Sequence, residues 1–156
     1  MAIQRRIVLD RYPVCKEYIM TRGKALTFPA EHFGKDLKDD TVYGAVIDMP
    51  MGPQLLTTMV CYINGAANLY FNLGGDYSGA AQRHPGVVQA ARSFILNAGQ
   101  YLEDAEKATQ FDLPRGRTHF VYLLTKGGIY SFAPTSDNTY GKAGDFTALT
   151  KAVAIK

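Results

Sequence analysis

The sequence predicts an α+β domain: one five-stranded, mainly antiparallel sheet with a long central helix and terminal helices packed on it. Two observations carry this prediction. Five apolar or alternating segments follow one another in two groups joined by short turns, and strands joined by hairpins are antiparallel. Between the groups lies a segment whose apolar residues recur at intervals of three and four, which indicates a helix. A chain of 156 residues fits one such domain, so we assign residues 1–156 to a single unit.

The first group of strands is expected at residues 41–49, 55–63 and 66–73. The turn Asn64-Gly65 between the last two is a strong hairpin signal, because both residue types accept positive φ. The long helix is expected over residues 85–108.

The second hairpin is expected from strands at 117–125 and 129–133, so sheet and long helix occupy residues 41–133. Residues 1–40 form an N-terminal helical segment and a connection, with a helix between Pro13 and Gly23. Whether these forty residues hold one helix or two elements stays open. Residues 134–156 are expected to be a loop and a C-terminal helix.

Charge and cysteine usage exclude several classes of protein. The net charge of +3 is too small to indicate a nucleic-acid partner, and no apolar run approaches the length of a membrane span, so we expect neither contact. Cys15 and Cys61 make no disulfide framework, and the first twenty residues carry no secretory signal, which favours a cytoplasmic protein with reduced thiols. No metal-binding spacing occurs, and we expect no metal and no cofactor.

The order of elements resembles that of the profilin-like group, which includes the roadblock domains. The segment from Gly44 to Asp48, followed by a glycine turn at Gly52, is similar to the opening strand of such domains. The resemblance covers residues 11–156 by element order. It implies a five-stranded antiparallel sheet with a long helix between two strand blocks. Roadblock domains place two strands before that helix and three after it, whereas this sequence predicts three before and two after.

A glycine-rich loop ahead of the long helix is the candidate ligand site. Helix N-termini attract anions, and glycines let the backbone approach a ligand closely. The loop has neither the Walker A nor the dinucleotide-binding spacing, and a plain turn between strand and helix is the favoured explanation. The candidate residues are Gly74, Gly75, Asp76, Tyr77, Ser78, Gly79, Arg83 and His84, faced by Tyr70 and Asn72.

No catalytic residue is assigned. Asp76, Ser78 and His84, or Cys61 with His119, are suitable residue types for nucleophilic chemistry, but no nucleophile elbow or comparable motif surrounds them. Whether the chain is an enzyme stays open, and the absence of such motifs favours a protein without catalysis.

Two functions are carried forward. The expected fourth strand has apolar residues on both faces, whereas a sheet covered on one side should alternate. We therefore expect a small intracellular interaction or scaffold module that forms a homodimer, or binds another protein, through a sheet face or an edge strand. Whether one face of the sheet is uncovered stays open, because core packing of the aromatic strand residues is the favoured explanation of the same pattern. The alternative is a ligand-binding or enzymatic domain that recognises a small anionic molecule at Gly74–Gly79.

Overall fold

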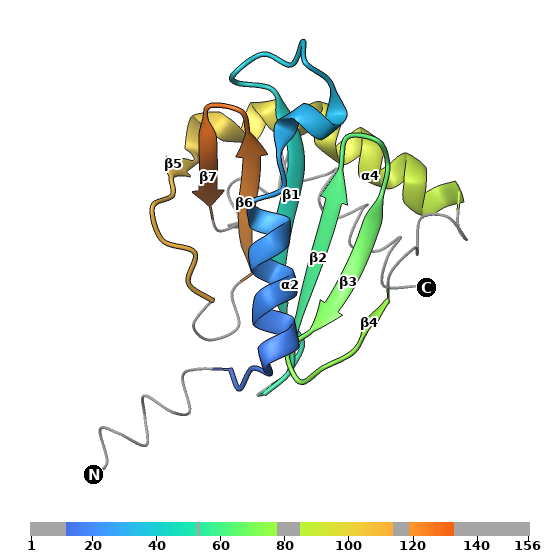
Figure 1. Ribbon diagram of the computed structural model, residues 1–156, viewed down its shortest axis with the longest axis vertical. Helices are drawn as coiled ribbons and strands as arrows, with labels where there is room; N and C mark the ends of the chain where they lie inside the picture. Colours follow the sequence, from blue (N-terminus) through green and yellow to red (C-terminus); the bar gives the residue numbers. More distant parts are fainter. Residues whose placement is uncertain (1–11, 53, 78–84, 114–118, 133–156) are drawn as a thin grey trace.

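The computed structural model describes residues 12–52, 54–77, 85–113 and 119–132 (Figure 1). Its strands form one seven-stranded sheet in the order β4-β3-β2-β1-β6-β7-β5, and every neighbouring pair is antiparallel. The helical elements are α2 (Lys16–Leu26), η1 (Ala30–Phe33), α4 (Pro85–Asn97) and η2 (Ala98–Asp104). The strands are β1 (Val42–Pro50), β2 (Leu56–Tyr62), β3 (Ala67–Phe71), β4 (Asp76–Tyr77), β5 (Glu106–Lys107), β6 (Phe120–Thr125) and β7 (Gly128–Phe132).

The predicted α+β class is confirmed, and the five predicted strands correspond to β1, β2, β3, β6 and β7. The sheet is wider than predicted because β4 and β5, each of two residues, extend its two edges. The Asn64-Gly65 hairpin joins β2 to β3, and Gly65 has the expected positive φ of 91°.

One face of the sheet is covered by α4 and η2. Their side chains Ala91, Phe94 and Tyr101 are buried against strand residues that share this face. The strand members of this cluster are Val42, Ala45, Ile47, Met49, Met59, Cys61, Ala67, Val121, Leu123 and Phe132. The alternation along β1 is interrupted, since a bulge between Val42 and Gly44 shifts the register against β6.

The opposite face is covered by α2, η1 and the chain around Phe111 (Figure 1). Ala25 and Leu26 of α2 pack there on Val46, Val60 and neighbouring strand residues. Both faces of the sheet therefore carry a packed core. Tyr122 and Leu124 of β6 are buried on this side, and Val121 and Leu123 on the other.

The sequence left open whether one face of the sheet is uncovered, and the structure answers this for β6, which is packed on both sides. Its apolar residues on both sides reflect helices and loops on both sides, as in a buried central strand.

The long central helix is shorter than predicted. Its α-helical part ends at Asn97, and a 3₁₀ segment continues to Asp104 in place of a helix to residue 108. Beyond it the backbone turns extended at Ala105, β5 pairs with β7, and the Ala108 amide donates to the Ile129 carbonyl at 2.7 Å. Sheet pairing at the edge has overridden the helical periodicity.

The N-terminal helix begins and ends later than predicted, since α2 passes through Gly23 and closes at Leu26. There the Thr27 amide and hydroxyl both donate to the Gly23 carbonyl, at 3.2 and 2.9 Å. The C-terminal helix expected after residue 144 lies outside the described residues.

Candidate functional site

A small open cavity lies between α2 and the end of β3. It has a volume of about 160 Å³. Its lining residues are Glu17, Tyr18, Thr21, Tyr70, Phe71, Gly74 and Gly75. The predicted loop thus borders a cavity through its first two glycines.

Both glycines have positive φ. Gly74 has φ of 117° and Gly75 has φ of 90°, a region that favours glycine. The Gly74 amide donates to the Phe71 carbonyl at 3.0 Å, and the Phe71 amide donates to the Gly75 carbonyl at 3.2 Å. The loop is therefore a closed turn whose glycines can lie at the cavity wall without a side chain in the way.

The other predicted site residues have different outcomes. Asp76 and Tyr77 form β4 and pair with Tyr70 and Leu69 of β3. Tyr70 lines the cavity as expected. The remaining four, Ser78, Gly79, Arg83 and His84, lie outside the described residues. An anion site that uses them stays a prediction.

Three lining residues come from α2 and were missed by sequence reasoning. Glu17, Tyr18 and Thr21 are one helical turn apart or adjacent, so they share one flank of the helix. Nothing local announces that this flank lies against β3, because Tyr70 is about fifty residues away in the sequence. The contact between α2 and β3 depends on tertiary packing, so the local sequence could not predict it.

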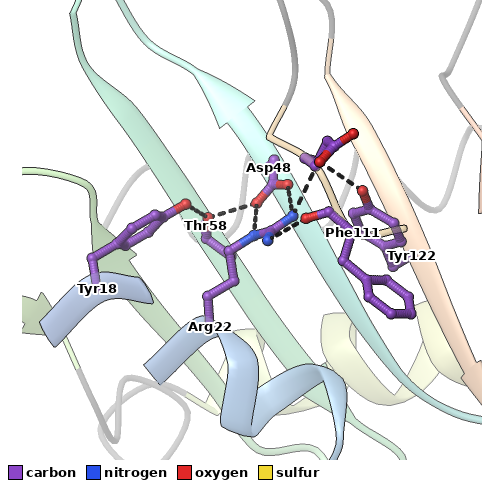
Figure 2. A network of polar contacts seen from close by, with 7 residues as sticks. Tyr18, Arg22, Asp48, Thr58, Phe111 and Tyr122 are labelled. Carbon is purple, nitrogen blue, oxygen red and sulfur yellow. Dashed lines mark hydrogen bonds and ion pairs between the residues drawn. The ribbon is translucent and has the colours of Figure 1, made fainter. Parts of the chain in front are cut away.

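Behind the cavity, α2 is joined to the centre of the sheet by a buried ion pair (Figure 2). The Arg22 Nη2 and Nε atoms donate to the Asp48 carboxylate at 2.8 and 3.2 Å. The Arg22 Nη1 atom donates to the Phe111 carbonyl at 2.7 Å, and Nη2 also approaches the Asp112 carbonyl at 3.4 Å. Arg22 thus connects α2, β1 and the chain that precedes β6.

The electrostatics of this pair are set by opposing effects. Burial by itself lowers the pKa of Arg22, but the hydrogen bond and the charge of Asp48 outweigh burial and raise that pKa above its ordinary value. The guanidinium carbon also lies 5.5 Å from the Tyr122 ring centroid, within the range of a cation–π contact. A buried charge of this kind is tolerated because its hydrogen bonds are made.

A chain of hydroxyl groups extends the pair toward the cavity. The Thr58 hydroxyl donates to Asp48 at 2.7 Å and lies 2.5 Å from the Tyr18 hydroxyl. Since Thr58 has one proton and gives it to Asp48, Tyr18 must be the donor to Thr58. Burial, followed by the charge of Asp48, raises the pKa of Tyr18 to about 12. Tyr18 therefore stays neutral and its hydroxyl is committed to the network.

The turn after β3 contains a second structural network, centred on Asn72. Its side chain accepts from the Leu56 amide at 2.9 Å and donates to the Pro13 and Gln54 carbonyls at 2.7 and 2.9 Å. Its backbone carbonyl accepts from the Cys15 amide at 2.9 Å. Asn72, expected to face the ligand site, instead fastens three segments of backbone together at one end of the sheet.

Exposed apolar side chains surround that junction, and we call them the apolar end. They are Val14 (41% exposed), Met51 (62%), Leu55 (53%) and Leu73 (55%). Val14, Leu55 and Leu73 directly follow Pro13, Gln54 and Asn72 in the chain, and these three belong to the Asn72 network. The Met51 amide donates to the Leu55 carbonyl. Figure 1 shows the start of α2, the β1–β2 connection and the end of β3 converging at this end.

The other chemistry considered from the sequence finds little support. Cys61 is fully buried in the core under α4, and burial raises the pKa of its thiol to about 12, so it is a poor nucleophile. Burial lowers the pKa of His119. Among the described residues, no group of three or more histidine, cysteine and acidic side chains could hold a metal ion.

In the same part of the chain, no helix has both the length and the apolar character to cross a bilayer. Comparisons with family models, with curated proteins and with solved structures found no match to this chain. The profilin-like resemblance accordingly stays a prediction that rests on element order.

Proposed function

We propose that this chain is a small interaction module that associates with a second copy of itself through the apolar end. The observation that carries the proposal is the set of four exposed apolar side chains held in place by the buried Asn72. Exposed apolar side chains that gather in one patch mark protein interaction sites, whereas singly scattered ones do not, and these four belong to segments that meet at one end of the sheet.

The construction of the apolar end supports an interface over a chance exposure. Loop side chains usually lose considerable conformational entropy on binding. Here the three contributing segments are tied by Asn72 before any partner arrives, so less order has to be imposed. The four side chains are also uncharged, which suits the core of a homodimer interface, where apolar residues are enriched and charges are depleted.

A second copy is the partner that fits this surface best. Two-fold contacts place the same patch on both subunits, and an uncharged patch meets its own image without like-charge repulsion. The edge strand β5 is a weaker candidate. It is two residues long and both of them, Glu106 and Lys107, are exposed charges, a pattern that discourages strand pairing.

The test is the mass of the protein as a function of concentration, measured by analytical ultracentrifugation. We expect a monomer–dimer equilibrium at micromolar concentrations. The double substitution Leu55→Gln/Leu73→Gln should weaken it by at least tenfold, because a two-fold dimer then loses four apolar side chains and a total of about 1.4 kcal/mol is enough for a tenfold change.

Leu96→Gln is the matched control. Leu96 is the most exposed large apolar side chain of the described residues, at 71%, but it lies on α4, away from the apolar end in Figure 1. It should leave the equilibrium unchanged. A wild-type protein that stays monomeric at 200 µM, roughly a hundredfold above a micromolar dissociation constant, or an equal effect of both substitutions, would refute this interface.

A further inference from the structure

The geometry points to a second site, and we propose that the cavity between α2 and β3 binds a cationic group: the ammonium or guanidinium head of a lysine- or arginine-like molecule. The site comprises Glu17, Thr21, the two tyrosines Tyr18 and Tyr70, and the Gly74-Gly75 turn. This inference goes beyond the proposed self-association and does not depend on it.

The size of the cavity limits the ligand. Pockets for nucleotides, cofactors and comparable molecules occupy roughly 300–1,000 Å³. The present cavity, at about 160 Å³, is close to an engineered cavity of about 150 Å³ that holds one benzene molecule. It therefore has room for one side-chain head group, while the rest of a ligand would lie outside the cavity.

The charge of the lining selects the sign of the ligand. Among the described residues that line the cavity, Glu17 alone has a charged side chain, and it is a carboxylate. An anion in this cavity would lie beside that carboxylate, while the Gly74 amide already donates to the Phe71 carbonyl. A cation gains a charge-assisted hydrogen bond from Glu17.

The remaining groups favour the same class. Aromatic rings attract ammonium and guanidinium groups through their electron-rich faces, and two tyrosines line the cavity. Thr21 adds a hydroxyl oxygen one helical turn from Glu17, and hydroxyl oxygens accept hydrogen bonds from such cations. The helix also holds this flank in place, since Arg22 and the Tyr18 hydroxyl are fixed to Asp48 and Thr58.

The experiment is a titration of the isotope-labelled protein followed by amide chemical shifts. The probes are Nα-acetyl-lysine amide, its neutral analogue Nα-acetyl-norleucine amide, n-butylamine and inorganic phosphate. We expect the lysine amide to shift the amides of Thr21, Gly74 and Gly75 at millimolar concentrations, and the norleucine amide and phosphate to leave them unchanged. Binding of butylamine as well would identify the free amine as sufficient, whereas its failure would assign recognition to a peptide-borne side chain.

Two substitutions test the role of the carboxylate. Glu17→Gln should weaken binding roughly three- to fivefold, the upper part of the range of an exposed ion pair, and Glu17→Asp should retain the preference for the cation. Glu31→Gln, at another exposed glutamate, is the control and should change nothing. The proposal is overturned if the lysine amide causes no shifts at about 50 mM, because even a site with a millimolar dissociation constant would then be filled. It is also overturned if the norleucine amide binds equally well, if phosphate shifts the same amides, or if Glu17→Gln binds the lysine amide as the wild type does. A separate mass measurement reports on self-association, so failure here leaves the apolar end untouched.

Discussion

Replacing Arg22 by methionine should be among the most damaging single changes on the α2 side of the sheet. Methionine keeps most of the unbranched stem and removes the guanidinium group. The substitution leaves the Asp48 carboxylate, which has no solvent exposure, with Thr58 as its remaining donor among the described residues. It also removes the donor to the Phe111 carbonyl, a contact of 2.7 Å.

The size of the effect follows from those losses. Breaking a buried ion pair by removing one partner costs about 3–5 kcal/mol, because an uncompensated charge is left behind. Domains of this size have about 5–15 kcal/mol of stability in total, so Arg22→Met should consume a large part of it. The exposed Lys24 on the same helix is the matched control, and Lys24→Met should change stability by less than about 0.5 kcal/mol.

Urea unfolding followed by circular dichroism measures these differences, and a double-mutant cycle separates charge from packing. Arg22→Met/Asp48→Leu removes both charges, so it should cost several kcal/mol less than the sum of the two single substitutions. A cost below about 1 kcal/mol for Arg22→Met, or strict additivity in the cycle, would refute the claim that the pair acts as a unit. If Arg22→Met is unfolded in water, Arg22→Lys, which keeps a charge but loses the forked geometry, gives a measurable intermediate.

Three further predictions follow from neighbouring features. Asn72→Ala should lower the free energy of unfolding, measured by denaturant titration, by about 3 kcal/mol, because it leaves the buried Leu56 amide and two carbonyls without their hydrogen-bond partner. A loss below about 1 kcal/mol would contradict the stabilising role of the Asn72 network. Tyr18→Phe should cost about 1 kcal/mol in the same assay, because it removes the hydroxyl that donates to Thr58; an unchanged free energy of unfolding would contradict this role of the hydroxyl. Burial raises the pKa of Cys61 from 9.0 to about 12, so the thiol keeps its proton to a higher pH in the folded state than in the unfolded state. Its contribution to stability is complete below pH 9 and is lost as the pH rises toward 12. Cys61→Ala should therefore reduce the loss of stability above pH 9, measured by unfolding under reducing conditions.

Local structure could be predicted wherever the signal was local. The hairpin at Asn64-Gly65 depends on neighbours in sequence: Gly65 supplies the positive φ and the Asn64 side chain accepts from the Ala66 amide at 3.0 Å. The strand pairs β1–β2, β2–β3 and β6–β7 followed from such turns. The pairing of Asp48 with Phe120 across the middle of the sheet had no such signal, because the two residues are separated by the whole central helix.

The polar networks could also be predicted only as far as the local sequence indicates them. An isolated aspartate inside the apolar run from Val46 to Met49 signals a buried charge that needs a partner. That signal alone identifies Asp48 but cannot identify Arg22, which is 26 residues away and reaches the strand only after α2 has packed. The role of Asn72 was misjudged for a related reason, since alternation along β3 gives the face of a side chain but not whether solvent or backbone lies opposite.

The arrangement of α2 separates structural from binding groups on a single helix. Arg22 and the Tyr18 hydroxyl point to the sheet, where every hydrogen bond they make serves the fold. Glu17 and Thr21 flank that row and line the cavity, and Glu17 itself is exposed. A change at Glu17 can therefore alter the charge of the cavity with little effect on stability, whereas a change at Arg22 loosens the helix and degrades the cavity indirectly. A Glu17 variant and an Arg22 variant that lose the same binding affinity should therefore differ in their free energy of unfolding. This difference distinguishes a residue that contacts the ligand from one that only positions the helix.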